Sequence, residues 1–174
     1  MEGVKEFWQM RDGAGSPRHP WPSLGAQFHT CCRRIGCESL RALARGMDVN
    51  EDMLCEALVD REDVDLSSSI FRFFRYFAGA FDEGCAVHTD IGVITVIPAT
   101  RVPALITLDE MTLRWRHYED DLPKNSVMIL CGETLECATG SFYRAVVHRV
   151  RRLAFDEPDR TSLVYLMRRR PVVS

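Results

Sequence analysis

The sequence predicts a mainly β protein with N-terminal helices, an α+β class in which two helices precede a core of short antiparallel strands. Two observations support this fold class: apolar residues recur with helical spacing before residue 69, and short apolar or alternating runs follow it. The chain has 174 residues, which is about the length of one domain with a substantial core. Gly and Pro in residues 1–25 predict irregular structure there, with room for a short helical turn in the first ten residues.

Two helices are expected before the β region. In the first, over about residues 28–45, Phe28, Cys32 and later apolar residues recur at steps of three and four, which places them on one helix face. The second helix is expected to start at Asn50, a good N-cap residue. Two acidic residues follow Asn50 in the first turn, where the helix dipole favours negative charge.

Closely spaced short runs dominate the chain after Ser69. Gly, Pro or acidic turn sequences separate many of these runs, which is typical of antiparallel strands rather than of alternating β-α units. The pattern therefore predicts an antiparallel sandwich or barrel. The expected strands cover residues 70–77, 86–90, 91–97, 104–109, 113–118, 126–131, 141–151 and 161–168.

Composition and charge exclude several classes of protein. With 22 Lys and Arg against 25 Asp and Glu, the formal net charge is -3, which argues against a dedicated nucleic-acid or membrane-surface protein. No apolar run approaches the ~20 residues of a membrane span. The 7 cysteines are an odd number without a Cys-x-x-Cys pair, so we expect most of them to be free, small, buried side chains in a reducing compartment. We predict a cytoplasmic monomer that acts on a small molecule, without a nucleic-acid or membrane partner.

Three residues combine into a candidate metal site. His88 and Asp90 lie two apart on an extended run, where alternate side chains project to the same face. His148, from a distant strand, supplies a second imidazole. Two histidines and one carboxylate leave positions open, which suits non-haem Fe(II) that admits both a substrate and O2. The alternative is a chance His-x-Asp pair whose histidines are ordinary core or surface residues.

A candidate anion-binding group follows His148. Arg160 and Ser162 are two apart on another strand-like run, so a guanidinium and a hydroxyl face one side. The planar fork of arginine suits a carboxylate, and the serine adds a donor. The phenol of Tyr76 can donate to the same small anion. The alternatives are a surface salt bridge for Arg160 and an ordinary sheet aromatic for Tyr76.

These residues belong to an ordered set of motifs. His88 begins the segment His-Thr-Asp-Ile-Gly, Gly132 begins Gly-Glu-Thr-Leu-Glu, His148 is followed by Arg and Val, and Arg160 begins Arg-Thr-Ser. In this order the motifs resemble the iron(II)/2-oxoglutarate-dependent dioxygenases of the isopenicillin N synthase-like type, over about residues 40–170. The ordered set is far more specific than any single motif.

The resemblance implies a fold and a metal. The fold is a double-stranded β-helix, a cupin-like jelly roll, over residues 70–174, with residues 1–69 forming a loop and helices that pack on this core. The metal is Fe(II), held by His88, Asp90 and His148 with no further catalytic residue.

The resemblance also implies 2-oxoglutarate and O2 as cosubstrates. Arg160 and Ser162 then bind the distal carboxylate of 2-oxoglutarate. Tyr76 matches the tyrosine of the family's Asn-x-Tyr element and assists, although Phe74 replaces the asparagine. The expected reaction is hydroxylation or desaturation of a small organic molecule, with release of succinate and CO2.

Relatives of this type are considerably longer, so the chain is expected to be either a truncated product or a minimal member. Two alternative functions stay open at this point. One is an iron-dependent oxidase that does not use 2-oxoglutarate, of the isopenicillin N synthase or aminocyclopropane-carboxylate oxidase kind. The other is a truncated, non-catalytic member of the family.

Overall fold

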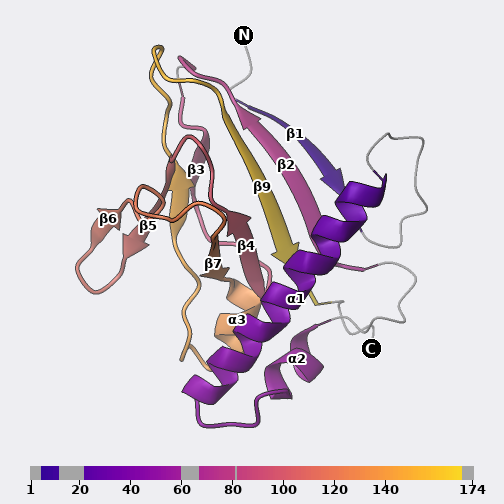
Figure 1. The fold of residues 1–174 in the computed structure, drawn as a ribbon. Helices are drawn as coiled ribbons and strands as arrows, with labels where there is room; N and C mark the ends of the chain where they lie inside the picture. The colour runs from indigo at the N-terminus through magenta and orange to yellow at the C-terminus, as the bar shows by residue number, and fades with distance from the viewer. Residues whose placement is uncertain (1–4, 12–21, 60–66, 81, 170–174) are drawn as a thin grey trace.

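Two antiparallel sheets and a set of helices make up the computed structural model, which describes residues 5–11, 22–59, 67–80 and 82–169 (Figure 1). The strands of the larger sheet lie in the order β1-β2-β9-β4-β7, and those of the smaller sheet in the order β3-β8-β5-β6. Except for β5 and β6, which are consecutive in the chain, neighbours in these orders come from distant parts of the sequence, so the sheets bring separated segments together.

The bounds of the elements are as follows. The larger sheet consists of β1 (Lys5–Met10), β2 (Ile70–Tyr76), β9 (Arg160–Met167), β4 (Ile94–Pro98) and β7 (Val127–Cys131). The smaller sheet consists of β3 (Cys85–His88), β8 (His148–Val150), β5 (Leu105–Asp109) and β6 (Arg114–Arg116). The helices are α1 (Pro22–Gly46), α2 (Met53–Leu58) and α3 (Glu133–Ala138).

Alternation along the strands gives the larger sheet two different faces. On β9, Tyr165 and Met167 belong to a core cluster that also contains Leu40 of α1. On β4, Ile97 belongs instead to a second cluster, together with Leu105 of the smaller sheet. Since successive side chains of a strand point to opposite faces, one apolar layer lies between sheet and helices and another lies between the two sheets.

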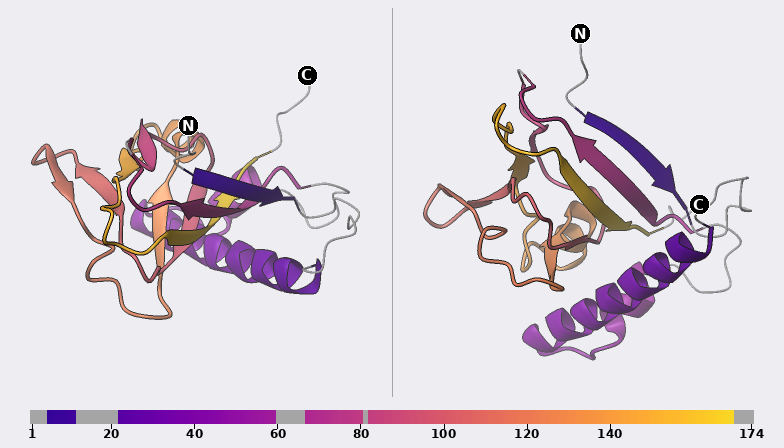
Figure 2. Two further views of the ribbon diagram at one scale, coloured as in Figure 1. Left: turned by 90° about the horizontal axis from the view of Figure 1, so that it is seen from above. Right: turned by 45° about the horizontal axis from the view of Figure 1, so that its top comes forward.

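The helices cover the outer face of the larger sheet. Helix α1 runs along this face, with contacts to β4 and β9, and α2 packs against α1 (Figures 1 and 2). The ring of Phe28 on α1 lies 4.8 Å, between centroids, from that of Phe71 on β2. The outer face is therefore closed by α1, and the space between the sheets is left for a functional site.

Several expectations about the elements are confirmed and others are wrong. The α+β class is confirmed, and so are both early helices, although α1 begins six residues before Phe28 and α2 begins at Met53. Asp52, not Asn50, is the N-cap residue, and the Asn50 side chain accepts a hydrogen bond from the Asp52 N–H at 2.9 Å. Instead of a helical turn, the first ten residues contain β1, which pairs with β2.

Two further expectations failed in the second half of the chain. Residues 141–151 were expected to form one long strand, but only His148–Val150 is a strand. Residues 133–138 form α3, a short helix that the sequence pattern did not indicate. Both segments lie near the candidate metal site, where tertiary hydrogen bonds decide the backbone conformation. The division of the chain after residue 69 stays a prediction.

Within the residues that the structure describes, no helix combines the length and the apolar character needed to cross a membrane. All seven cysteines are free thiols, but only Cys32 is buried, so the expectation that most of them are buried is wrong.

Candidate metal centre

The structure brings His88, Asp90 and His148 together. Each offers one donor atom, and these three atoms lie within 4.8 Å of one another. The Nε2 atoms of His88 and His148 are each 3.8 Å from one of the two carboxylate oxygens of Asp90. His88 ends β3 and His148 begins β8, and the two residues face each other in the register of the smaller sheet. The predicted cluster therefore exists as a cluster of potential metal ligands.

Backbone carbonyl groups orient both imidazole rings. The Nδ1 of His88 lies 2.8 Å from the Ala86 oxygen, and the Nδ1 of His148 lies 2.9 Å from the Val146 oxygen. In each case the ring donates from Nδ1, so the Nε2 lone pair is left for a metal. The donor set thus fits a cation that takes two imidazoles and one carboxylate.

The two imidazoles differ in their acid–base properties. The hydrogen bond with the Cys85 sulfur raises the pKa of His88 to about 9, against the opposite effect of burial. Burial lowers the pKa of His148. A metal ion therefore competes with a proton at His88, whereas it meets a neutral imidazole at His148 at pH 7.

Asp90 lies beyond the end of β3 and is held from two directions. Thr95 on β4 donates its hydroxyl hydrogen bond to the Asp90 carboxylate at 2.6 Å. The N-terminus of α3 holds the backbone of the same loop, because the Glu133 N–H donates to the Asp90 carbonyl oxygen at 2.8 Å. A Cβ at position 132 would lie 2.8 Å from that oxygen and 2.2 Å from the Gly92 oxygen, so only glycine fits there.

Helix α3 also positions the segment that leads to His148. The Glu136 carboxylate accepts a hydrogen bond from the Ala145 N–H at 2.9 Å. The Val146 N–H donates to the Cys131 oxygen at the end of β7, also at 2.9 Å. The Gly-Glu-Thr-Leu-Glu motif therefore supports both sides of the cluster, the loop of Asp90 and the approach to His148.

A cavity of about 190 Å³ opens beside the cluster, between the two sheets. Its lining includes the three potential ligands and also Tyr76, Arg160 and Ser162, so all six predicted site residues border one space. Tyr76 on β2 pairs directly with Arg160 on β9, and Ser162 lies two residues further on the same face. Burial raises the pKa of Tyr76, so its hydroxyl stays protonated at neutral pH and can donate.

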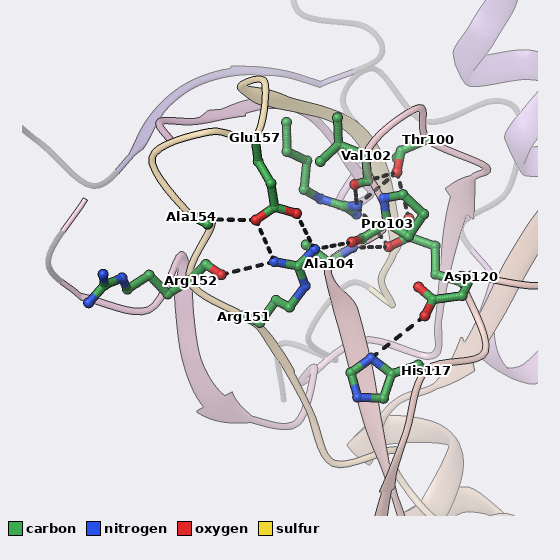
Figure 3. A network of polar contacts seen from close by, with 12 residues as sticks. Thr100, Val102, Pro103, Ala104, His117, Asp120, Arg151, Arg152, Ala154 and Glu157 are labelled. Carbon is green, nitrogen blue, oxygen red and sulfur yellow. Dashed lines mark hydrogen bonds and ion pairs between the residues drawn. The ribbon is translucent and has the colours of Figure 1, made fainter. Parts of the chain in front are cut away.

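Arg160 has a buried partner that the sequence did not reveal. Its Nη1 donates to the Glu119 carboxylate at 2.7 Å, and the two side chains are 1% and 2% exposed. The same Nη1 donates to the Thr100 hydroxyl at 2.8 Å and to the Val102 oxygen at 2.6 Å. Figure 3 labels Thr100 and Val102, which lie next to each other close to Ala104. Glu119 in turn accepts hydrogen bonds from Thr100 and from the N–H groups of Ala104 and Leu105.

This network leaves the other edge of the Arg160 guanidinium available. Within the described residues, all hydrogen bonds of the guanidinium start from Nη1, and the Nε is buried without a partner. A buried donor without an acceptor is costly, and a carboxylate bound in the cavity would satisfy it. The site therefore fits a small carboxylate molecule such as 2-oxoglutarate. Glu119 holds the arginine from behind.

The residues that sequence reasoning missed are Glu119 and Thr95, whereas the Gly-Glu-Thr-Leu-Glu motif was noted but not as a helix. The position of Thr95 had a signal, because it lies on a strand five residues after Asp90. Glu119 had none, since it lies between β6 and β7 in a turn-rich segment, far from Arg160 in the chain. Only the long-range pairing of β9 with the rest of the larger sheet brings Arg160 to it.

The chain is similar to a known protein family and to curated relatives. The family model of the 2OG-Fe(II) oxygenase superfamily matches residues 69–169. A 2-oxoglutarate-dependent dioxygenase of Gibberella zeae is 29% identical over 147 residues, which cover 82% of this chain and 42% of that relative. The 2-oxoglutarate-dependent dioxygenase frbH of Dothideomycetidae sp. is 31% identical over 133 residues, covering 74% and 40%. The chain spans about two fifths of the length of these curated relatives.

Solved structures show the same fold. A Neurospora crassa protein in complex with alpha-KG matches with a TM-score of 0.77 and 20% identity, over 95% of this chain and 54% of that one. JOX2, solved with 2OG, Fe and JA, matches with a TM-score of 0.76 and 19% identity, over 98% and 51%. These likenesses confirm the jelly-roll core. Since the family match covers more than half of the sequence, the chain belongs to the 2OG-Fe(II) oxygenase superfamily.

Proposed function

We propose that the protein is an Fe(II)- and 2-oxoglutarate-dependent oxygenase that hydroxylates or desaturates a small organic molecule, with release of succinate and CO2. The observation that carries this proposal is the convergence of His88, Asp90 and His148, with donor atoms within 4.8 Å, beside a cavity that contains a buried guanidinium. Relatives named 2-oxoglutarate-dependent dioxygenases support the cosubstrate. The Neurospora crassa protein has also been solved with thymine, which supports a small-molecule substrate.

His88, Asp90 and His148 would hold the iron. Their arrangement supports this role, because both Nδ1 atoms are engaged by carbonyl oxygens and the Asp90 carboxylate is fixed by Thr95. Two imidazoles and one carboxylate leave coordination positions for other ligands. When bound, the iron supplies the oxidising chemistry together with O2 and 2-oxoglutarate.

Arg160, Ser162 and Tyr76 would bind the distal carboxylate of 2-oxoglutarate. The Nε of Arg160 is a buried donor that needs an acceptor, and Ser162 and Tyr76 add hydroxyl donors on the same sheet face. Glu119 keeps the guanidinium in place through Nη1, so the arginine does not have to be ordered when the cosubstrate binds. These residues position the cosubstrate and carry out no proton transfer.

The remaining walls of the cavity keep water from the reacting groups. They are largely apolar and come from both sheets: Ile97, Leu105, Val150, Val164 and Leu166. Exclusion of water from an active site limits side reactions of a reactive oxidant.

One observation favours a second candidate function, an iron-dependent oxidase that does not use 2-oxoglutarate. The Glu119 carboxylate already neutralises the charge of Arg160, and an incoming carboxylate meets this negative charge behind the guanidinium. Iron binding would then be retained, whereas 2-oxoglutarate would bind weakly or not at all.

The test is anaerobic addition of Fe(II) and then of 2-oxoglutarate to the full chain. We expect a saturable metal-to-ligand charge-transfer absorption that appears only after 2-oxoglutarate is added. The His88→Ala variant should not show it, whereas Arg75→Met, a substitution on the opposite face of β2, should show it unchanged. Iron binding without this absorption would favour the oxidase, and absence of iron binding would overturn both candidates.

We also propose that the protein is a cytoplasmic monomer without a nucleic-acid or membrane partner, in which residues 1–69 pack on a core of residues 70–174. The free state of all seven cysteines supports a reducing compartment. The formal net charge of -3 supports the absence of a nucleic-acid partner. Size-exclusion chromatography with light scattering tests the oligomeric state.

A further inference from the structure

The inner face of β1 and β2 carries charged and aromatic side chains that the proposed iron and cosubstrate sites do not use. In the antiparallel register, Lys5 pairs with Tyr76, Phe7 with Phe74 and Gln9 with Arg72. Lys5, Phe7, Phe74 and Arg72 all line the same cavity as the potential metal ligands. This part of the cavity wall is therefore available to a substrate.

The cavity has an excess of positive charge. Apart from its histidines, its charged lining residues are Lys5, Arg72, Arg160 and one carboxylate, Asp90, which is a proposed metal ligand. Arg160 is neutralised by Glu119. Among the described residues, no carboxylate forms an ion pair with Arg72 or with Lys5, and Lys5 contacts the Cys85 thiol instead. Arg72 therefore faces the cavity without a carboxylate partner.

Arg75 on the same strand makes the contrast clear. It points to the opposite face of β2, where its guanidinium lies 2.8 Å from the Asp159 carboxylate and 3.5 Å from that of Glu6. Arg72 instead donates from Nε to the amide oxygen of Gln9 at 2.9 Å. A neutral amide orients this arginine without neutralising it, and its terminal nitrogens can still bind an anion.

Arg72 is well separated from the cosubstrate group. It lies four residues from Tyr76 along β2, roughly 13 Å, whereas Tyr76 pairs directly with Arg160. Asp90 lies toward the Arg72 end, because its partner Thr95 is in register with Leu166, which pairs with Ile70. One molecule can therefore reach from Arg72 to the metal centre without occupying the position of the 2-oxoglutarate carboxylate.

Two aromatic rings lie beside Arg72 on the same cavity wall, where Phe7 on β1 pairs with Phe74 on β2. The centroids of Phe7 and Phe74 are 5.7 Å apart, and the Arg72 guanidinium lies 5.6 Å from the Phe7 ring. Phe7 is 59% exposed, so it offers a large apolar surface at the rim of the cavity. An apolar or aromatic molecular body would gain from covering it.

We propose that the substrate is a carboxylic acid with an apolar body, whose carboxylate binds Arg72 and whose body lies against Phe7 and Phe74. The inference rests on the proposed function and names the substrate class of the same site. Arg72 is then a residue that determines specificity, and Lys5 adds positive potential at the entrance.

The experiment measures binding without turnover. The full chain is loaded anaerobically with Mn(II) and 2-oxoglutarate, and binding is followed by calorimetry. The probes are 3-phenylpropanoate, its methyl ester and phenyl phosphate. We expect the acid to bind at least tenfold more tightly than the ester. Arg72→Met should weaken binding of the acid at least tenfold and leave the ester unchanged, and Arg72→Lys should recover part of the loss.

Arg75→Met is the matched control and should bind all probes like the parent. Equal affinity of the parent for the acid and the ester would overturn the proposal. So would an equal loss of affinity for the acid in Arg72→Met and Arg75→Met. Tighter binding of phenyl phosphate than of the acid would contradict a carboxylic acid and would indicate a phosphate ester as the substrate class. A weaker affinity for 2-oxoglutarate in Arg72→Met would assign Arg72 to the cosubstrate instead.

The failure of the proposed function can be distinguished from the failure of the proposed substrate class. Absence of the 2-oxoglutarate-dependent absorption with Fe(II) contradicts the proposed function, whereas a normal absorption without binding of the acid contradicts only the substrate class.

Discussion

The two faces of the larger sheet use neighbouring residues of the same strands in different ways. On the outer face, Tyr165 and Met167 of β9 are completely buried in a cluster that Leu40 of α1 closes. On the inner face, Arg160 and Ser162 of the same strand are also buried, yet they border a cavity. All four side chains are buried, but on this strand the outer face is closed by apolar packing, whereas the inner face places polar groups beside the apolar cluster between the sheets.

The difference shows what a buried polar face requires. Asp90 is bound by Thr95, Arg160 by Glu119, and the two imidazoles by carbonyl oxygens. These four polar groups are thus held by protein partners while they line the cavity. We expect substitutions on the outer face to change stability, and substitutions on the inner face to change binding unless they uncover a buried charge.

The largest effect is expected from removing a ligand on the inner face. His88→Ala should lower the affinity for Fe(II) by at least about 100-fold and reduce 2-oxoglutarate turnover to background. Its free energy of unfolding should stay within about 0.5 kcal/mol of the parent, because His88 lies at the end of a short strand. Metal titration and urea unfolding measure the two quantities. Turnover at the parental rate would contradict the site assignment.

Arg160→Ala should combine both kinds of effect. It removes the guanidinium proposed for 2-oxoglutarate and leaves the Glu119 carboxylate buried and unpaired, which costs about 3–5 kcal/mol of stability. Urea unfolding measures this loss. The double variant Arg160→Met with Glu119→Gln should recover much of the stability but not 2-oxoglutarate binding, and a double variant as unstable as Arg160→Ala would disprove the role of the ion pair.

A substitution on the outer face should affect stability alone. Leu40→Ala removes a completely buried side chain from the contact of α1 with the sheet, so a loss of about 2–5 kcal/mol is expected. Leu24→Ala, on an exposed part of the same helix, should cost less than about 0.5 kcal/mol. Fe(II) affinity should be unchanged in both variants, and a large change in either would show that the two faces are coupled.

The smallest effect concerns pH. Burial alone would raise the pKa of Glu119, but the charge of Arg160 and the hydrogen bonds from Arg160 and two backbone N–H groups outweigh it and hold this pKa below its usual value. The carboxylate therefore contributes stability that is fully present above its unfolded pKa, about 4.3, and is lost as the pH falls through the lower folded value.

The Glu119→Gln variant should lack this contribution. Between the unfolded and the folded pKa, its free energy of unfolding should fall less steeply with decreasing pH, by up to about 1.4 kcal/mol per pH unit, which corresponds to one proton. Urea unfolding at a series of pH values below 5 checks this prediction. Parallel curves for variant and parent would show that Glu119 does not titrate with folding.

The parts of the site that the sequence predicted are pairs of residues separated by two positions in the chain. His88 and Asp90 lie two apart, and so do Arg160 and Ser162, so strand alternation predicted each pair on one face. This holds for Arg160 and Ser162 on β9, whereas Asp90 lies beyond the end of β3 and is held near His88 by Thr95 and α3. The strand bounds were less accurate near the cluster, where β3 ends at His88 and β8 is limited to three residues. There, hydrogen bonds from α3 replace strand pairing, and no periodicity in the sequence announces them.

The sequence by itself determined the fold class, the candidate ligand set and the candidate cosubstrate residues, because these depend on local periodicity and on motifs in a fixed order. Only the tertiary structure decided that Glu119 lies behind Arg160, that α3 supports Asp90 and that β1 places Lys5 and Phe7 at the cavity. The physical reason is that these contacts join residues far apart in the chain. Their meeting depends on sheet register and packing, which local sequence patterns do not encode.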